Sequence, residues 1–376
     1  MNVKSIIKDI IPPICTRQIQ RGLSLIKGNQ DLIYNTYKQL VNLNGKIIDP
    51  DFFVVAPHGV GLASFIYYLN LIGLPTTCLT HNYYPKVLNE KIYAYGYTCD
   101  YAGKFNREYF TKKRRDIFLL LRDPILILLS TINQMIENRL TLIGSWSEYD
   151  YGDGLSDHTM EFLINKNAKS YIMYESQMQS IPNYGDIYIY QTDDIMPLKC
   201  KETMREILKI FNSKDIDKYD DEIFKIQYNS GKNRLFKYSN YIILKNDIKV
   251  FFCQYKFYDY NFNCWEANTK ISELQHAGNN YVIFVNNKDN NKIELNNEDI
   301  YIIKNYIDMY EEMISSIVNI YEKFKLSPEN IVQYFLSKKG KKYRDILLKT
   351  LDTELAIIKK IKMNIIDEWN YYKMIL

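Results

Sequence analysis

Short apolar runs alternate with helical patterns along the first 211 residues of the chain. Runs rich in β-branched and aromatic residues, with the length of buried strands, lie at 51–57, 76–80, 116–121 and 186–190. Segments whose apolar residues recur at helical spacing lie at 62–72, 124–137 and 199–211. Strands that alternate with helices predict an α/β fold, in which a parallel sheet is flanked by helices and joined by right-handed crossovers.

Residues that begin or end helices support these boundaries. Gly73 and Pro75 follow the first helical segment and stop it. Asp123 is placed to cap the second helix, with Pro124 at its first helical position. Closer to the C-terminus, Ser327 and Pro328 predict the start of another helix in the same way.

The pattern changes beyond residue 230. Aromatic and β-branched runs broken by Asn and Asp clusters over 236–295 predict β-hairpins. Helical patterns follow over 298–324 and from 343 to the last residue. We therefore predict an α/β domain with an N-terminal helical segment (1–230), a β-hairpin elaboration (231–297) and a helical C-terminal region that packs on the domain (298–376).

The composition is that of an ordinary globular protein, with 47% hydrophobic and 24% charged residues. The 34 tyrosines accompany many Asn, Ile and Lys residues, which we attribute to an AT-rich genome rather than to nucleic-acid binding. A net charge of +4 allows a local site for an anionic ligand but does not require a polyanionic partner. We therefore do not expect a nucleic acid as partner.

Two negative features point to the cytoplasm. No run approaches the roughly 20 apolar residues that span a bilayer. The first 15 residues are interrupted by charges and by Pro12 and Pro13, unlike a signal peptide. The six cysteines lack the spacings of zinc or redox motifs, so we expect no metal. The basic segment 4–27 favours an amphipathic helix that packs on the domain, and its alternative is at most a peripheral contact with a membrane.

A loop with two glycines follows the first predicted strand, and we call it the glycine loop. It consists of Pro57, His58, Gly59, Val60, Gly61, Leu62, Ala63 and Ser64. Between a strand and a helix start, such a loop directs backbone N–H groups and the positive end of the helix dipole at one point, which suits phosphate or sulfate. It lacks the GxxxxGK[ST] pattern of a Walker loop. Taken alone, it is equally typical of an ordinary strand-to-helix turn.

Three further polar residues fall at or near the same predicted sheet edge. Arg122 ends the strand 116–121, where open α/β sheets bind ligands, and its guanidinium suits phosphate oxygens. Ser130 lies about two turns into the next helix. His81 follows the strand 76–80, where it suits a base near neutral pH. The alternatives are an ion pair for Arg122, a surface hydroxyl for Ser130 and a core hydrogen bond for His81.

The order of these pieces resembles the PAPS-dependent sulfotransferase family, which has a P-loop-like fold, over about 51–211. PAPS is 3′-phosphoadenosine 5′-phosphosulfate. Further matches are Gly144-Ser145-Trp146, similar to the family's GSW, and 187–194, similar to the segment with its Tyr-Glu-Asp-Leu motif. Tyr174-Glu175 is a rival match to that motif. Lys338, Lys339 and Gly340 are similar to the basic Arg-Lys-Gly element that closes over the 3′-phosphate.

The resemblance implies a divergent bacterial sulfotransferase that transfers the sulfuryl group from PAPS to a hydroxyl, and we expect a surface glycan, such as a capsule or lipooligosaccharide precursor, as acceptor. It implies that Arg122 and Ser130 bind the 3′-phosphate, and that His81 is the catalytic base. The residues that it implies around the 5′ end of the donor are Gly59, Val60, Gly61, Leu62, Ala63 and Ser64.

One departure from the family concerns the glycine loop. The family usually carries a lysine there, to neutralise charge on the bridging oxygen, and this chain has His58. If His58 is protonated, its imidazolium takes the lysine's place as a catalytic group. The departure leaves open a glycan-modifying transferase on the same fold that uses a different activated donor. The large region past Ser230, in which the sequence shows no candidate chemistry, leaves open a non-catalytic binding protein.

Overall fold

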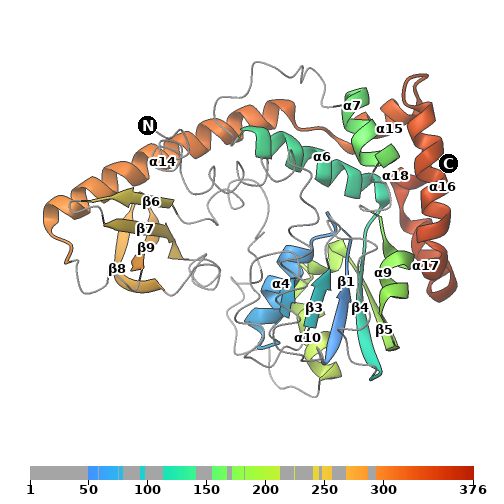
Figure 1. Ribbon diagram of the computed structural model, residues 1–376, viewed down its shortest axis with the longest axis horizontal. Coiled ribbons are helices and arrows are strands. Elements are labelled where there is room, and N and C mark those ends of the chain that lie inside the picture. Colours follow the sequence, from blue (N-terminus) through green and yellow to red (C-terminus); the bar gives the residue numbers. More distant parts are fainter. Residues whose placement is uncertain are drawn as a thin grey trace, which may run out of the picture. The chain divides into compact units, whose positions relative to one another are not determined.

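The computed structural model describes residues 50–57, 59–74, 76–78, 94–97, 113–140, 155–166, 172–181, 183–211, 224, 240–244, 248–255, 268–286 and 294–376. These residues form two compact units, one built on a parallel sheet and one on an antiparallel sheet (Figure 1). Among the helices so described, none has the length and apolar character needed to cross a membrane.

Five parallel strands form the sheet of the first unit. In order across the sheet they are β2 (Thr76–Cys78), β3 (Ala94–Tyr97), β1 (Phe52–Val55), β4 (Arg115–Leu121) and β5 (Tyr184–Gln191). The predicted parallel sheet is confirmed, and β3 is a strand that we did not predict. All four residues of β1 are buried, as expected of a strand with both faces covered.

The strand order places β1 at a switch point. The chain leaves β1 toward β2 on one side of the sheet, whereas β4 and then β5 follow on the other side. The segments that leave the carboxyl ends of β1 and β4 therefore diverge, although the two strands are direct neighbours. In open α/β sheets ligands bind in the crevice outside such a point.

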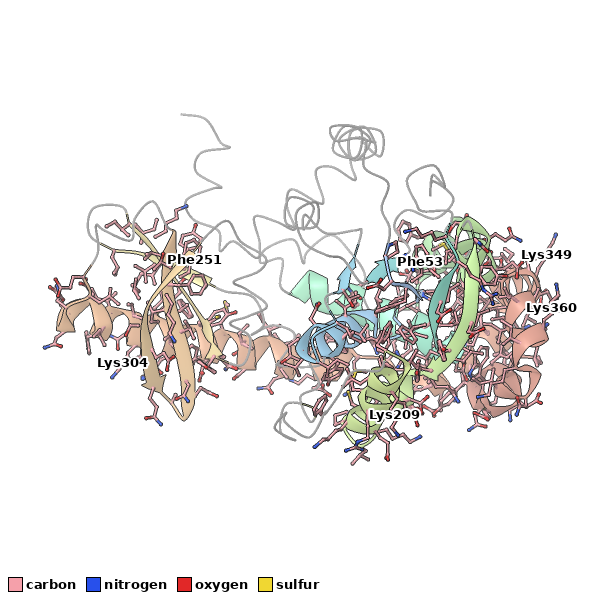
Figure 2. All side chains as sticks on the ribbon, turned by 90° about the horizontal axis from the view of Figure 1, so that it is seen from below. Phe53, Lys209, Phe251, Lys304, Lys349 and Lys360 are labelled. Carbon is pink, nitrogen blue, oxygen red and sulfur yellow. The ribbon has the colours of Figure 1, made fainter. Side chains whose placement is uncertain are left out.

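Helices cover both faces of this sheet. Of the helices in this part of the chain, α4 (Leu62–Leu71), α9 (Tyr174–Ser180) and α10 (Cys200–Ile210) flank the strands, and the others are α6 (Pro124–Leu140), α7 (Asp157–Met160) and the π-helix η4 (Glu161–Lys166). Phe65 of α4 and Phe211 at the end of α10 both pack on the ring of Phe118 in β4. Figure 1 shows α4 and α10 on one side of the strands, and α9 on the other. Figure 2 labels Phe53 of β1, which is buried between these layers.

The C-terminal helices form an outer layer on α9. They are α15 (Pro328–Leu336), α16 (Lys341–Glu354), α17 (Ala356–Ile361), the short η10 (Met363–Glu368) and α18 (Asn370–Lys373). Both α16 and α17 contact α9, and Lys349 and Lys360 project from them into solvent (Figure 2). The predicted cap is confirmed, because the Ser327 hydroxyl accepts a hydrogen bond from the N–H of Asn330 at 3.4 Å. The predicted helix from 343 onward is broken into short pieces.

The second unit contains the predicted hairpins. Its antiparallel strands run in the order β6 (Asn240–Ile243), β7 (Lys249–Gln254), β9 (Asn279–Asn286) and β8 (Asn268–His276). Helix α14 (Asn297–Phe324) packs on this sheet, where Tyr306 and Tyr310 contact the ring of Phe252. The division of the chain at residues 230 and 297 stays a prediction.

Candidate functional site

The backbone of the glycine loop is set by two glycines with left-handed torsions. Gly59 has φ +80° and Gly61 has φ +88°, a region that suits glycine because it has no Cβ. Gly61 is the N-cap of α4, and no side chain caps this helix or places a carboxylate in its first turn. The first N–H groups of α4 therefore face the loop without an intrahelical partner, at the positive end of the helix dipole.

Arg122 reaches this loop from the end of β4. Its Nη1 donates a hydrogen bond to the carbonyl oxygen of Gly59 at 2.5 Å, and its backbone N–H donates to the Tyr174 hydroxyl at 3.3 Å. Burial lowers the pKa of Arg122, and the nearby Asp193 carboxylate partly offsets that effect. Within the described part of the chain, the guanidinium donates this single hydrogen bond. Since a guanidinium has five N–H donors, most have no acceptor among the described residues.

Ser130 lies against the same glycine. A Cβ added to Gly59 would stand 3.2 Å from the Cβ of Ser130, 3.4 Å from its Oγ and 3.1 Å from the carbonyl oxygen of Ile127. The fold thus brings Gly59, Arg122 and Ser130 together from three separate elements. We call this group, with the N–H groups of the glycine loop, the anion rim.

The anion rim is completed by a residue that our sequence reasoning missed. The Thr192 hydroxyl, just after β5, lies 3.0 Å from the carbonyl oxygen of Val60 and 3.3 Å from that of Leu121, and its one proton is shared between these two acceptors. Thr192 begins the short helix η5 (Thr192–Ile195), which also packs on the loop, since a Cβ on Gly61 would stand 2.9 Å from Ile195 Cδ1. Its position directly after a predicted strand, at the same sheet edge, was the sequence feature that could have indicated Thr192 as a site residue.

Asp123 joins the anion rim to the C-terminal end of the chain. As predicted, its Oδ1 caps α6 by accepting the N–H of Ile125 at 2.9 Å. Its Oδ2 accepts the N–H groups of Tyr371 at 2.9 Å and Tyr372 at 3.1 Å, in α18. Burial raises the pKa of Asp123, and these hydrogen bonds act in the opposite direction. Arg122 is thus followed by a residue that is held both by the start of α6 and by the distant helix α18.

Several predicted site residues contribute backbone rather than side chains, or lie elsewhere. Val60 and Leu62 are buried in the core, whereas Ser64 is partly buried in α4. His58, His81 and Gly144-Ser145-Trp146 lie outside the described residues, as does the side chain of Ala63. Their predicted roles stay predictions. The described residues include no group of three or more His, Cys, Asp or Glu side chains suited to hold a metal ion.

The predicted basic element forms the turn between α15 and α16. Lys338 is exposed, and Lys339 Nζ lies 3.9 Å from Asp157 of α7. Gly340 is buried, and a Cβ at this position would overlap the carbonyl oxygen of Tyr334. The contacts seen for Lys339 and Gly340 are therefore with α7 and α15, and closure of this turn over a phosphate stays a prediction.

Comparison with known proteins gives a match to a family model. No curated protein and no solved structure matches the chain. The model of a family described as "Protein of unknown function (DUF2972)" matches residues 189–376, which is half of the chain. This segment starts near the end of β5 and contains Thr192 and the C-terminal helices. The chain therefore belongs to the DUF2972 family of proteins of unknown function.

Proposed function

We propose that this chain is a sulfotransferase, which transfers the sulfuryl group of PAPS to a hydroxyl of an acceptor, with a glycan as the expected class. The observation that carries the proposal is the hydrogen bond from Arg122 to Gly59, with Ser130 against the same glycine. It supports the proposal because the resemblance assigns these residues to the two anionic ends of one donor molecule.

The geometry of one peptide unit separates two groups of donors. In a trans peptide the C=O and the following N–H point in opposite directions. Since Arg122 binds the Gly59 carbonyl, the N–H of Val60 points away from the guanidinium. The spare donors of Arg122 and the N–H groups of the loop therefore serve two different positions. A nucleotide with one phosphate at the 3′ position and another at the 5′ position suits such a pair.

The proposed reaction is an in-line displacement at sulfur. The acceptor oxygen forms a new bond to sulfur while the bond from sulfur to the bridging oxygen of the 5′-phosphate breaks. The proton of the acceptor hydroxyl passes to His81, and adenosine 3′,5′-bisphosphate leaves. Loop N–H groups and a protonated His58 stabilise the charge that develops on the leaving phosphate. Holding the acceptor oxygen in line with the bond that breaks supplies much of the rate acceleration.

A transferase with a different donor is the second candidate, since His58 stands where the family usually has a lysine. A thermal-shift experiment separates the two. A ligand at one hundred times its Kd stabilises the fold by about 2.7 kcal/mol. We expect adenosine 3′,5′-bisphosphate to raise Tm, and ADP, a nucleotide sugar and matched inorganic sulfate to leave it nearly unchanged. Equal stabilisation by ADP or the nucleotide sugar would favour the second candidate, and no shift with the bisphosphate would refute the first.

A further inference from the structure

Thr192 holds the glycine loop from the side of β5. The residue is 9% exposed, and its hydroxyl lies between two backbone carbonyls, at 3.0 Å from Val60 and 3.3 Å from Leu121. It thereby links the glycine loop after β1 to the last residue of β4. We propose that Thr192 is a positioning residue, which orients the N–H of Gly61 toward the 5′-phosphate of the donor. This inference rests on the proposed function.

The orientation follows from the planarity of the peptide. The hydroxyl of Thr192 fixes the direction of the Val60 carbonyl, so the N–H of Gly61 must point the opposite way. Arg122 fixes the preceding carbonyl, that of Gly59, in the same manner. Two successive N–H groups, those of Val60 and Gly61, are thus held with their carbonyls anchored to the protein. Successive N–H groups beside left-handed residues form a concave site for anions.

Thr192 acts from an ordered support, because η5 is capped at its start and hydrogen-bonded to α10 through Asp194. The N–H of Gln191 donates to Asp194 Oδ2 at 2.7 Å, and the Thr203 hydroxyl of α10 donates to the Asp194 carbonyl at 2.6 Å. The position of the hydroxyl is therefore set before any ligand binds. Replacing it by a methyl group keeps the volume but removes the donor from the Val60 carbonyl, so the peptide is free to turn.

The test compares three adenosine nucleotides with variants at one position. Thr192→Val removes the hydroxyl, whereas Thr192→Ser keeps it and loses the methyl group. Thr159→Val is the matched control, since this buried threonine of α7 bonds only the Ser156 hydroxyl among the described residues, at 3.0 Å. Isothermal titration calorimetry gives the Kd of adenosine 5′-monophosphate, adenosine 3′-monophosphate and adenosine 3′,5′-bisphosphate for each variant.

Thr192→Val should weaken the binding of the two ligands that carry a 5′-phosphate about tenfold. The reason is that the hydrogen bond from the Gly61 N–H to this phosphate is charge-assisted, and such a bond is worth about 1.5 kcal/mol or more. Its affinity for the 3′-monophosphate should equal that of the parent chain, and a merely structural role would not produce this split. Thr192→Ser and Thr159→Val should bind all three ligands like the parent.

Two results overturn the inference and leave the proposed function standing. One is a Thr192→Val variant with unchanged affinity for the 5′-monophosphate, or with equal losses for both monophosphates. The other, which applies even if the valine variant does not fold, is a tenfold loss of 5′-monophosphate affinity in Thr192→Ser. A parent chain that binds none of the three nucleotides refutes the proposed function, and this inference with it.

Discussion

Gly59 and Gly73 have the same left-handed torsion, φ +80°, in very different surroundings. A Cβ on Gly73 meets nothing within 4 Å, whereas a Cβ on Gly59 meets Ser130 and the Ile127 carbonyl at 3.1 to 3.4 Å. Alanine at Gly73 therefore costs stability only through its left-handed backbone, whereas alanine at Gly59 also costs stability through contacts of the added methyl group. This pair of residues provides a matched test of the anion rim.

We expect Gly73→Ala to lower the free energy of unfolding by about 1 to 2 kcal/mol, the cost of a left-handed alanine. Gly59→Ala should cost more, because the methyl group must also displace Ser130 or the loop. It should also abolish binding of adenosine 3′,5′-bisphosphate, which Gly73→Ala should leave intact. Urea unfolding and calorimetry measure the two effects. Equal stability of the variants would contradict the close packing at Gly59.

At the scale of elements, apolar runs made most of the parallel sheet predictable. The strands β1, β4 and β5 are such runs, and Asp123 and Pro124 marked the start of α6 correctly. Strand β3 was missed because its sequence, AYGY, is short and contains a glycine, which is unfavourable in strands. The long C-terminal helix was overpredicted, because helical spacing continues through the turns that separate α16, α17, η10 and α18.

Asp123 links two elements that are far apart in the sequence, namely α6 and α18. Its carboxylate accepts three backbone N–H groups. Asp123→Ala leaves these donors without their acceptor, so we expect a loss of about 2 to 4 kcal/mol in the free energy of unfolding. Asp367→Ala, at an exposed site just before α18, is the control and should change stability by less than about 0.5 kcal/mol. Urea denaturation measures the free energy of unfolding of both variants. Similar losses would argue that Asp123 does not stabilise the fold by linking α6 to α18.

At the scale of the whole molecule, both halves of the chain contribute to the anion rim. Gly59, Arg122 and Ser130 precede the segment that the DUF2972 family covers, whereas Thr192, Tyr371 and Tyr372 lie within it. The approach of Arg122 to the glycine loop could be predicted, because both follow the carboxyl ends of parallel strands. The contact of Asp123 with Tyr371, 248 residues away, could not, since no periodicity encodes such a distant pairing.

The central claim is that Arg122 and the glycine loop form one site for a doubly phosphorylated adenosine. Its most direct test is the Kd of adenosine 3′,5′-bisphosphate for Arg122→Ala, measured by calorimetry. As a control, Arg344→Ala removes the same charge from α16, where Arg344 lies beside Asp345. The account predicts that Arg122→Ala weakens binding roughly 100-fold, the effect of losing about 2.7 kcal/mol, and that Arg344→Ala leaves it unchanged. An Arg122→Ala variant that binds the bisphosphate as tightly as the parent chain would contradict it.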